Sequence, residues 1–191
     1  PPGARVVSTE GKTILPGLID SHIHLREHMP PMFLHYGVTT VADTNNYTDW
    51  TIAEREALKS GKVKGPRLFV SGTAIDGAAG NPNPALPRQP FGAYSHTSSD
   101  GSTSPSVALQ SVEETRAYVR SLAAKHVDMV KTDLDLTFDQ VRAAIEEAGK
   151  VHLPLVGHTQ NIRKAAEIGH KYMEHTDTLG RAVLDQMGGP E

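Results

Sequence analysis

The sequence predicts an α/β fold built on a parallel sheet. Strand-like and helix-like segments alternate about six times along the 191 residues, a pattern typical of βαβ units. Two capping boxes, Ser111 with Glu114 and Thr137 with Gln140, mark where two of the helices begin. Because βαβ crossovers are right-handed, the carboxyl ends of the strands should share one face, which carries the active site in α/β barrels and in open α/β sheets alike.

The composition narrows the classes of function. The chain is long enough for one domain with a sizeable core. Its net charge of −3 argues against nucleic acid as a partner, and no apolar run approaches the roughly 20 residues that cross a bilayer. It has no cysteine, which excludes disulfides and thiolate metal sites, and no signal peptide opens it, so we expect a cytoplasmic protein with a small-molecule partner. Ten histidines are the unusual feature, because imidazole is a common metal ligand.

The chain opens with a polar segment followed by a strand. Pro1–Thr13 is rich in turn residues and has too few apolar residues for a core of its own, and since Pro1 is not an initiator methionine, we expect a processed or partial chain. Ile14–Ile19 predicts a buried strand. It leads to His22 and His24, which fall on one face because successive strand residues alternate.

Two imidazoles at a strand end can bind one metal ion, although two histidines at this spacing also occur by chance. Asp20 lies on the same strand face as His22 and His24. It is either an acceptor that orients the two rings or a simple strand-end carboxylate.

The next elements are shorter and less regular. Arg26–Tyr36 predicts a weak helix, Val38–Ala42 a β-branched strand, Thr51–Ser60 a helix that Gly61 ends, and Arg67–Val70 a third strand.

A long segment without apolar periodicity follows. Asp76–Ser106 is rich in Gly, Pro, Asn and Ser, and such a run inside a compact domain is either a mobile surface loop or a functional lid. As a lid it would overhang the site. Arg88, Tyr94 and His96 are then the candidates for contact with a substrate.

Three further strands end in residues that can bind a metal. Val127–Val130 leads to Lys131, Val151–Val156 to Gly157-His158, and Tyr172–Glu174 to His175. Taken singly, each histidine is more often structural than catalytic, but together these residues should converge with His24 on one face of the sheet. Strand alternation turns Glu174 away from the direction of His175. The helices between these strands carry apolar stripes at helical spacing.

Lys131 has two interpretations. An ammonium group is repelled by a metal ion, so the simpler reading pairs it with Asp133 or Asp135. A neutral amine, in contrast, can act as a nucleophile. Capture of carbon dioxide would convert it to an anionic carbamate, whose two oxygens can bridge two cations.

These motifs resemble the amidohydrolase superfamily. GKTILPGLIDSHIHL is similar to the first barrel strand, which carries an aspartate-x-His-x-His motif, and GVTTVADTNN and GPRLFVSGTAI resemble the second and third strands of the branch related to imidazolonepropionase and the Xaa-Pro dipeptidases. VDMVKTDLD, LPLVGHTQ and GHKYMEHTDTL resemble strands four to six. The resemblance runs from about Glu10 to Leu179 and implies an incomplete (β/α)8 TIM barrel over residues 14–191, preceded by a remnant of a β-sandwich domain over residues 1–13.

The resemblance also implies the site. His22 and His24 would hold one metal ion and His158 and His175 a second, with carboxylated Lys131 bridging two divalent ions, zinc being the usual one. Such a centre hydrolyses carbon–nitrogen bonds of amides, dipeptides or lactams through a metal-bridged hydroxide.

The chain departs from the family pattern at its end. The aspartate that closes the eighth strand, a metal ligand and general acid/base, has no counterpart here, so the catalytic residue is unknown and we expect a fragment without full activity. A second copy or a complementing chain could supply the rest. Two alternatives stay open: a non-catalytic metal-binding fragment or scaffold, and a mononuclear deaminase-like member in which Lys131 is an ordinary amine.

Overall fold

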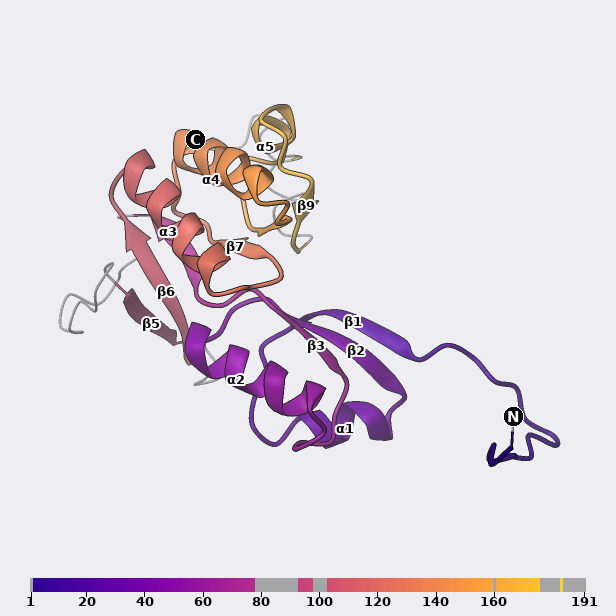
Figure 1. Cartoon of the computed structure of the whole chain (residues 1–191). Coiled ribbons are helices and arrows are strands. Elements are labelled where there is room, and N and C mark those ends of the chain that lie inside the picture. Colours follow the sequence, from indigo (N-terminus) through magenta and orange to yellow (C-terminus); the bar gives the residue numbers. More distant parts are fainter. Residues whose placement is uncertain (1, 78–92, 98–102, 160, 176–182, 184–191) are drawn as a thin grey trace.

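The computed structural model describes residues 2–77, 93–97, 103–159, 161–175 and 183. The predicted alternation of strands and helices is confirmed (Figure 1). The elements are β1 (Leu18–Ile23), α1 (Pro30–His35), β2 (Val38–Asp43), α2 (Thr48–Lys59), β3 (Arg67–Val70), β4 (Ala74–Gly77), β5 (Ala93–Thr97), β6 (Thr103–Leu109), α3 (Val112–Ala124), β7 (Val130–Thr132), α4 (Phe138–Lys150), β8 (Leu155–Gly157), α5 (Ile162–Glu167) and β9 (Tyr172–Met173). Within the part of the chain that is described, no helix is long and apolar enough to cross a membrane.

The strands form two sheets, and both are mainly parallel. One sheet has the order β1-β2-β3 and the other the order β5-β6-β4-β7-β8-β9. Among the described strands, only the pairing of β5 with β6 is antiparallel. The predicted third strand, Arg67–Val70, is confirmed as β3 and pairs with β2. The separate strand β4, which begins at Ala74, pairs with β6 and β7. From β4 through β7 and β8 to β9 the larger sheet follows chain order, while β6 and β5 lie on the other side of β4. The described strands do not close into a barrel, as expected for an incomplete TIM barrel.

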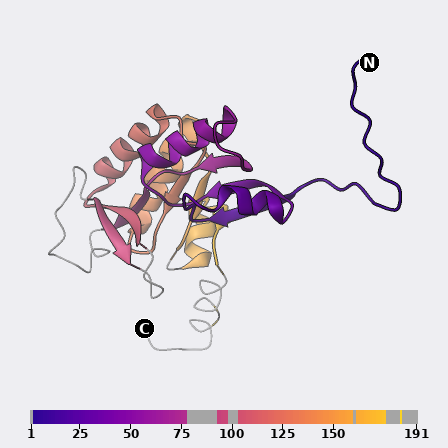
Figure 2. The ribbon, with the colours of Figure 1, turned by 90° about the horizontal axis from the view of Figure 1, so that it is seen from below.

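Each sheet has its own apolar core. Along the larger sheet, α3 and α4 lie side by side (Figures 1 and 2), and the core between them and the strands includes Val107, Leu122 and Val130. The smaller sheet packs Val41 and Val70 against partly buried apolar residues of α1 and α2. The helices therefore cover one side of the strands and leave the strand ends free to form a site.

The segment expected to lack structure contains strands. β4 extends to Gly77, and β5 and β6 form an antiparallel pair, with β6 also running parallel to β4. The prediction failed because β6 reads TSPSVAL, which has little hydrophobic periodicity of its own. Its pairing with β4 and the burial of Val107 and Leu109 stabilise it as a strand.

The first predicted strand is shifted and exposed. β1 begins at Leu18, and residues 2–17 form no helix or strand. Leu18 and Ile19 are 62% and 72% exposed, although the sequence predicted burial. The reason is that β1 is the edge of its sheet and pairs with β2 alone among the described strands. In Figures 1 and 2 the residues before β1 extend away from the rest of the molecule.

The two predicted capping boxes differ in outcome. Thr137 and Gln140 form the complete box at the start of α4. At the start of α3 the Ser111 side chain accepts the Glu114 N–H, but the Glu114 carboxylate accepts the N–H of Gln110 instead of Ser111.

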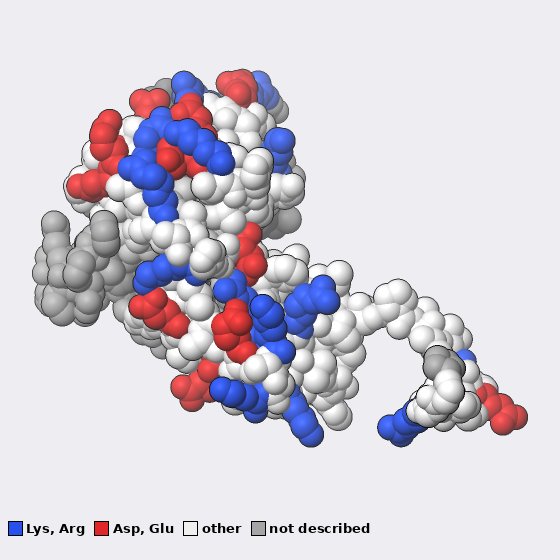
Figure 3. Space-filling model, in the orientation of Figure 1, with Lys and Arg blue, Asp and Glu red and all other residues white. Residues whose placement is uncertain are grey.

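The surface is mixed in charge. Figure 3 shows Lys and Arg interspersed with Asp and Glu over the helices, without a large area of one sign on this face.

Candidate metal centre

Four histidines from three strand ends lie next to one another. His22 lies in β1 and His24 directly follows it, His158 directly follows β8, and His175 lies two residues after β9. The ring centroids of His22 and His24 are 5.3 Å apart, and those of His22 and His175 are 4.8 Å apart. The rings of His158 and His175 are also 4.8 Å apart. The structure therefore brings the four predicted histidines together.

Close packing of two strands places His158. The residue before it, Gly157, has φ +148°, and a Cβ at this position would lie 2.2 Å from the carbonyl oxygen of Thr132. Only glycine allows β8 to approach β7 this closely. The His158 N–H then donates to the Thr132 carbonyl at 3.1 Å, which sets the backbone direction beside Lys131.

Lys131 lies in the middle of β7 and not at its end as predicted, because the strand runs one residue further, to Thr132. It is 2% exposed, and its Nζ forms an ion pair with the Glu174 carboxylate. Burial lowers the pKa of Lys131 to about 8, with Asp133 acting in the opposite direction. The direct partner of this buried amine is therefore Glu174, not the Asp133 or Asp135 of the simpler prediction.

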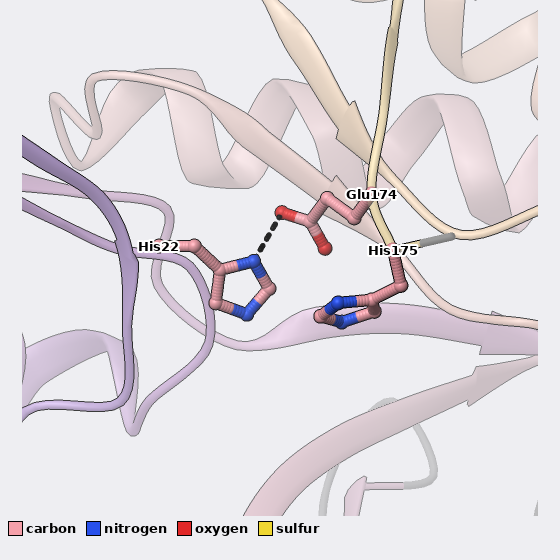
Figure 4. A group of neighbouring side chains, drawn as sticks. All are labelled: His22, Glu174 and His175. Atoms are coloured by element: carbon pink, nitrogen blue, oxygen red, sulfur yellow. Dashed lines mark ion pairs between the residues drawn. The ribbon is translucent and has the colours of Figure 1, made fainter. Parts of the chain in front are cut away.

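Glu174 is the residue that sequence reasoning missed. Strand alternation predicted that it turns away, and this was wrong. β9 ends at Met173 and His175 has φ +60°, so the alternation stops before both residues. The Glu174 side chain is 11% exposed, and its Oε1 lies 3.3 Å from His22 Nδ1 (Figure 4). The signal available in the sequence was the position of a carboxylate directly before a candidate ligand.

Oxygen atoms lie beside Nδ1 of three of the histidines. His24 Nδ1 is 3.2 Å from the Asn45 carbonyl oxygen, and His158 Nδ1 is 3.3 Å from Asp133 Oδ1. Together with the contact of His22 with Glu174, these oxygens favour the tautomer that carries its proton on Nδ1, which leaves the lone pair on Nε2 for a metal ion.

Of the two roles left open for Asp20, its hydrogen bond fits that of a strand-end carboxylate. Its carboxylate accepts the backbone N–H of His22 at 3.2 Å, within its own strand. The carboxylate that reaches the His22 ring is Glu174. Asp20 therefore shapes the backbone at the end of β1.

Burial favours the neutral, metal-binding form of two of the four histidines. It lowers the pKa of His22, with the charge of Lys131 acting in the same direction. It likewise lowers the pKa of His24. Burial acts to raise the pKa of Asp133, but His158, Lys131 and the Leu134 N–H together outweigh it and hold the pKa below its ordinary value. These shifts favour neutral imidazoles at His22 and His24 and an ionised carboxylate at Asp133.

These residues fit a divalent metal ion. One ligand atom each from His22, Glu174 and His175 lie within 4.8 Å of one another, and imidazole nitrogen with carboxylate oxygen is a donor set that suits zinc.

The three substrate candidates stay a prediction. Arg88 lies outside the described residues. Tyr94 and His96 belong to β5, whose backbone is described and whose side chains are not.

The strands and helices form part of an α/β barrel, and the histidine cluster lies at the ends of its strands. The chain belongs to the amidohydrolase family, whose model matches residues 13–187. None of the curated proteins matches it.

Solved structures share this fold at low identity. A prolidase complexed with N-methylphosphonate-L-proline has a TM-score of 0.73 and 21% identity, over 98% of this chain and 55% of the prolidase. A Xaa-Pro dipeptidase with bound methionine has a TM-score of 0.65 and 19% identity, over 91% of this chain and 52% of the dipeptidase. A putative prolidase from Bifidobacterium longum has a TM-score of 0.64 and 21% identity, over 87% and 42% of the two chains. The chain thus spans about half the length of these proteins.

Proposed function

We propose that this chain carries the metal-binding part of an amidohydrolase that hydrolyses carbon–nitrogen bonds. The observation that supports it is the gathering of His22, His24, His158 and His175, three of them with an oxygen beside Nδ1. His22 and His24 would hold one divalent ion, zinc in the first instance, and His158 and His175 a second. When bound, such ions acidify a water molecule and polarise the carbonyl of the substrate.

Lys131 would serve the proposed centre as a carbamate. Its neutral amine attacks carbon dioxide, a C–N bond forms and one proton is lost, which leaves an anion with two oxygens for the two ions. The low exposure of Lys131 supports this role, because the burial that lowers its pKa to about 8 increases the neutral fraction that can react. The ion pair with Glu174 acts against it, since it holds the amine protonated.

The proposed substrate is a dipeptide or a related N-acyl compound. The neighbours named as prolidase and Xaa-Pro dipeptidase favour this choice among amides, dipeptides and lactams. Because the chain spans about half the length of these neighbours, we propose metal binding for this part and leave turnover to the test below.

The test combines metal analysis with an activity panel. We expect about two zinc ions per chain, and loss of zinc from a variant that combines His22→Ala with His24→Ala. Xaa-Pro dipeptides, N-acyl amino acids and lactams form the panel. Turnover that depends on zinc would show an active hydrolase, whereas a folded, zinc-loaded and inactive chain would favour the metal-binding fragment or scaffold. A folded wild-type chain that takes up no zinc would contradict the proposal.

The ion pair of Lys131 with Glu174 favours a second candidate, a mononuclear centre in which Lys131 stays an amine. His22, Glu174 and His175 would then hold a single ion. One zinc ion per chain, unchanged by added bicarbonate, would support this candidate over the binuclear one.

A further inference from the structure

Asp43, a residue outside the metal cluster, is a buried carboxylate that the proposed reaction does not use. It is the last residue of β2 and is 1% exposed, next to the apolar core of the smaller sheet. A carboxylate in such surroundings is costly unless hydrogen bonds compensate for its lost hydration. The carboxylate accepts three: from Leu25 N–H at 3.3 Å, from Asn46 Nδ2 at 3.1 Å and from Thr51 Oγ1 at 2.7 Å.

These three donors belong to different segments of the chain. Leu25 follows β1, Asn46 follows β2, and Thr51 lies in the first turn of α2. Asn46 Nδ2 donates a second hydrogen bond, to the Leu25 carbonyl at 2.9 Å. Both backbone groups of Leu25 are thereby held by side chains from the end of β2, so Asp43 and Asn46 form a buried bracket around one residue.

The bracket encloses the neighbour of a candidate ligand. Leu25 directly follows His24, and on the other side of His24 the Ile23 carbonyl accepts the Thr44 N–H at 3.0 Å. The backbone of His24 is therefore fixed from both sides by residues 43–46. The same segment supplies the Asn45 carbonyl that lies 3.2 Å from His24 Nδ1.

We propose that Asp43 is a positioning residue for the metal centre. Its carboxylate binds the end of β1 to the end of β2, which sets His24 against the Asn45 carbonyl and leaves Nε2 of His24 free for a metal ion. This proposal rests on the proposed function, in which His24 is a ligand. It assigns to Asp43 an effect on His24 that a residue needed only for stability would not have.

The test uses Asp43→Asn in the metal-free and the zinc-loaded chain. The variant keeps the shape of the side chain but places an NH2 group where Asn46 and Thr51 donate. The matched control is Asp76→Asn, because Asp76 is also a buried strand-end aspartate and accepts backbone N–H groups, from Gly77 at 2.9 Å and Asp135 at 3.0 Å, far from His24 in the chain.

Two readouts are measured above the ordinary pKa of histidine. The first is the tautomer of His24 in the metal-free chain, from its ring 15N chemical shifts. We expect one Nδ1–H tautomer in the wild type and in Asp76→Asn, and a mixture in Asp43→Asn. The second is zinc affinity, which should fall about tenfold to a hundredfold in Asp43→Asn, as for other residues that orient metal ligands, and stay near the wild-type value in the control.

The possible outcomes separate the two proposals. If folded Asp43→Asn keeps the His24 tautomer and the zinc affinity of the wild type, Asp43 is not a positioning residue. If Asp43→Asn does not fold, the test uses Asn46→Ala, which keeps the Asp43 carboxylate but removes the hydrogen bond to the Leu25 carbonyl. We again expect a mixture of His24 tautomers and weaker zinc binding, and wild-type values of both would contradict the proposal. A wild type that binds no zinc would contradict the proposed function, while the tautomer of His24 would still decide the role of Asp43.

Discussion

At the scale of single residues, the site depends on what lies beside each ligand. An oxygen atom lies beside Nδ1 of three of the histidines, His22, His24 and His158. These oxygens belong to Glu174, Asn45 and Asp133, which are all distant in sequence from the histidine that they contact. Imidazole alone can bind a metal through either nitrogen. An oxygen beside Nδ1 favours the tautomer in which Nε2 is free for the metal ion. These oxygens therefore contribute to metal affinity as well as to structure.

Lys131→Met should distinguish a binuclear centre bridged by Lys131 from a centre that does not need this residue. Methionine fills a similar buried volume but cannot form a carbamate, so we expect zinc content to fall from about two ions to about one. The exposed Lys125→Met is the control, since Lys125 is 48% exposed and pairs with Asp49. Metal analysis of the dialysed proteins makes the measurement. An unchanged zinc content in folded Lys131→Met would exclude a bridging role for Lys131.

His170 should make the fold sensitive to acid. It is 2% exposed, and neither ring nitrogen has a hydrogen-bond partner among the described residues. Burial, with a smaller effect from the charge of Lys131, lowers its pKa from 6.5 to about 4. Because the folded state holds the neutral ring, the stability from this group is present above pH 6.5 and is lost as the pH falls towards 4.

His170→Leu should remove this dependence. Urea unfolding of the metal-free chain at several pH values would show a smaller loss of stability on acidification in His170→Leu than in the wild type. The exposed His28→Leu is the control and should follow the wild type. Parallel pH profiles for His170→Leu and the wild type would show that His170 does not carry the acid sensitivity.

At the scale of elements, caps and pairing partners determine which segments form. α4 begins with a complete capping box, in which Thr137 Oγ1 accepts the Gln140 N–H at 3.2 Å and Gln140 Oε1 accepts the Thr137 N–H at 3.1 Å. Gln140 Nε2 also donates to the Leu109 carbonyl at 3.0 Å, so the cap joins α4 to the end of β6.

Thr137→Ala should therefore destabilise the fold by about 1 kcal/mol, the typical value for a lost helix cap. Chemical denaturation monitored by circular dichroism makes the measurement. Thr13→Ala serves as the control, because Thr13 is exposed and lies in the segment before β1 that forms no strand. Equal unfolding midpoints for Thr137→Ala and the control would show that the box does not contribute.

At the scale of the whole molecule, the edge strand β1 leaves apolar residues exposed to solvent. β1 pairs with β2 alone among the described strands, and apolar side chains are exposed along it and before it. Unpaired strand edges with apolar residues promote association. We predict that a second copy or a complementing chain covers this edge. Substitution of the exposed residues tests this prediction directly.

Replacement of Leu18 and Ile19 by lysine should reduce self-association. Both side chains are more than 60% exposed, so the changes should cost little stability in a monomer. Sedimentation velocity over a range of concentrations should show association of the wild type and a shift towards monomer in the double variant. Val151→Lys is the control, since Val151 is 44% exposed at the end of α4. The same distribution of species in the wild type and the double variant would contradict the prediction.

The sequence determined the order of elements and the identity of the four histidines. Apolar runs, helix caps and glycines are local signals, and local signals suffice to place β2, β7, β8 and α4 within a few residues. The parallel arrangement follows from the alternation itself, because right-handed crossovers bring strand ends to one face. His22, His24, His158 and His175 were therefore predicted to converge without any contact being known.

The tertiary structure decided what non-local contacts control. β6 has little periodicity of its own and exists because β4 pairs with it, and the exposure of β1 depends on the absence of a second neighbour among the described strands. Glu174 turns into the site because β9 stops at Met173, which strand alternation could not anticipate. The partners of Nδ1 and the bracket around Leu25 likewise join different segments. Such contacts depend on how the segments pack, and the residue order within one segment does not contain them.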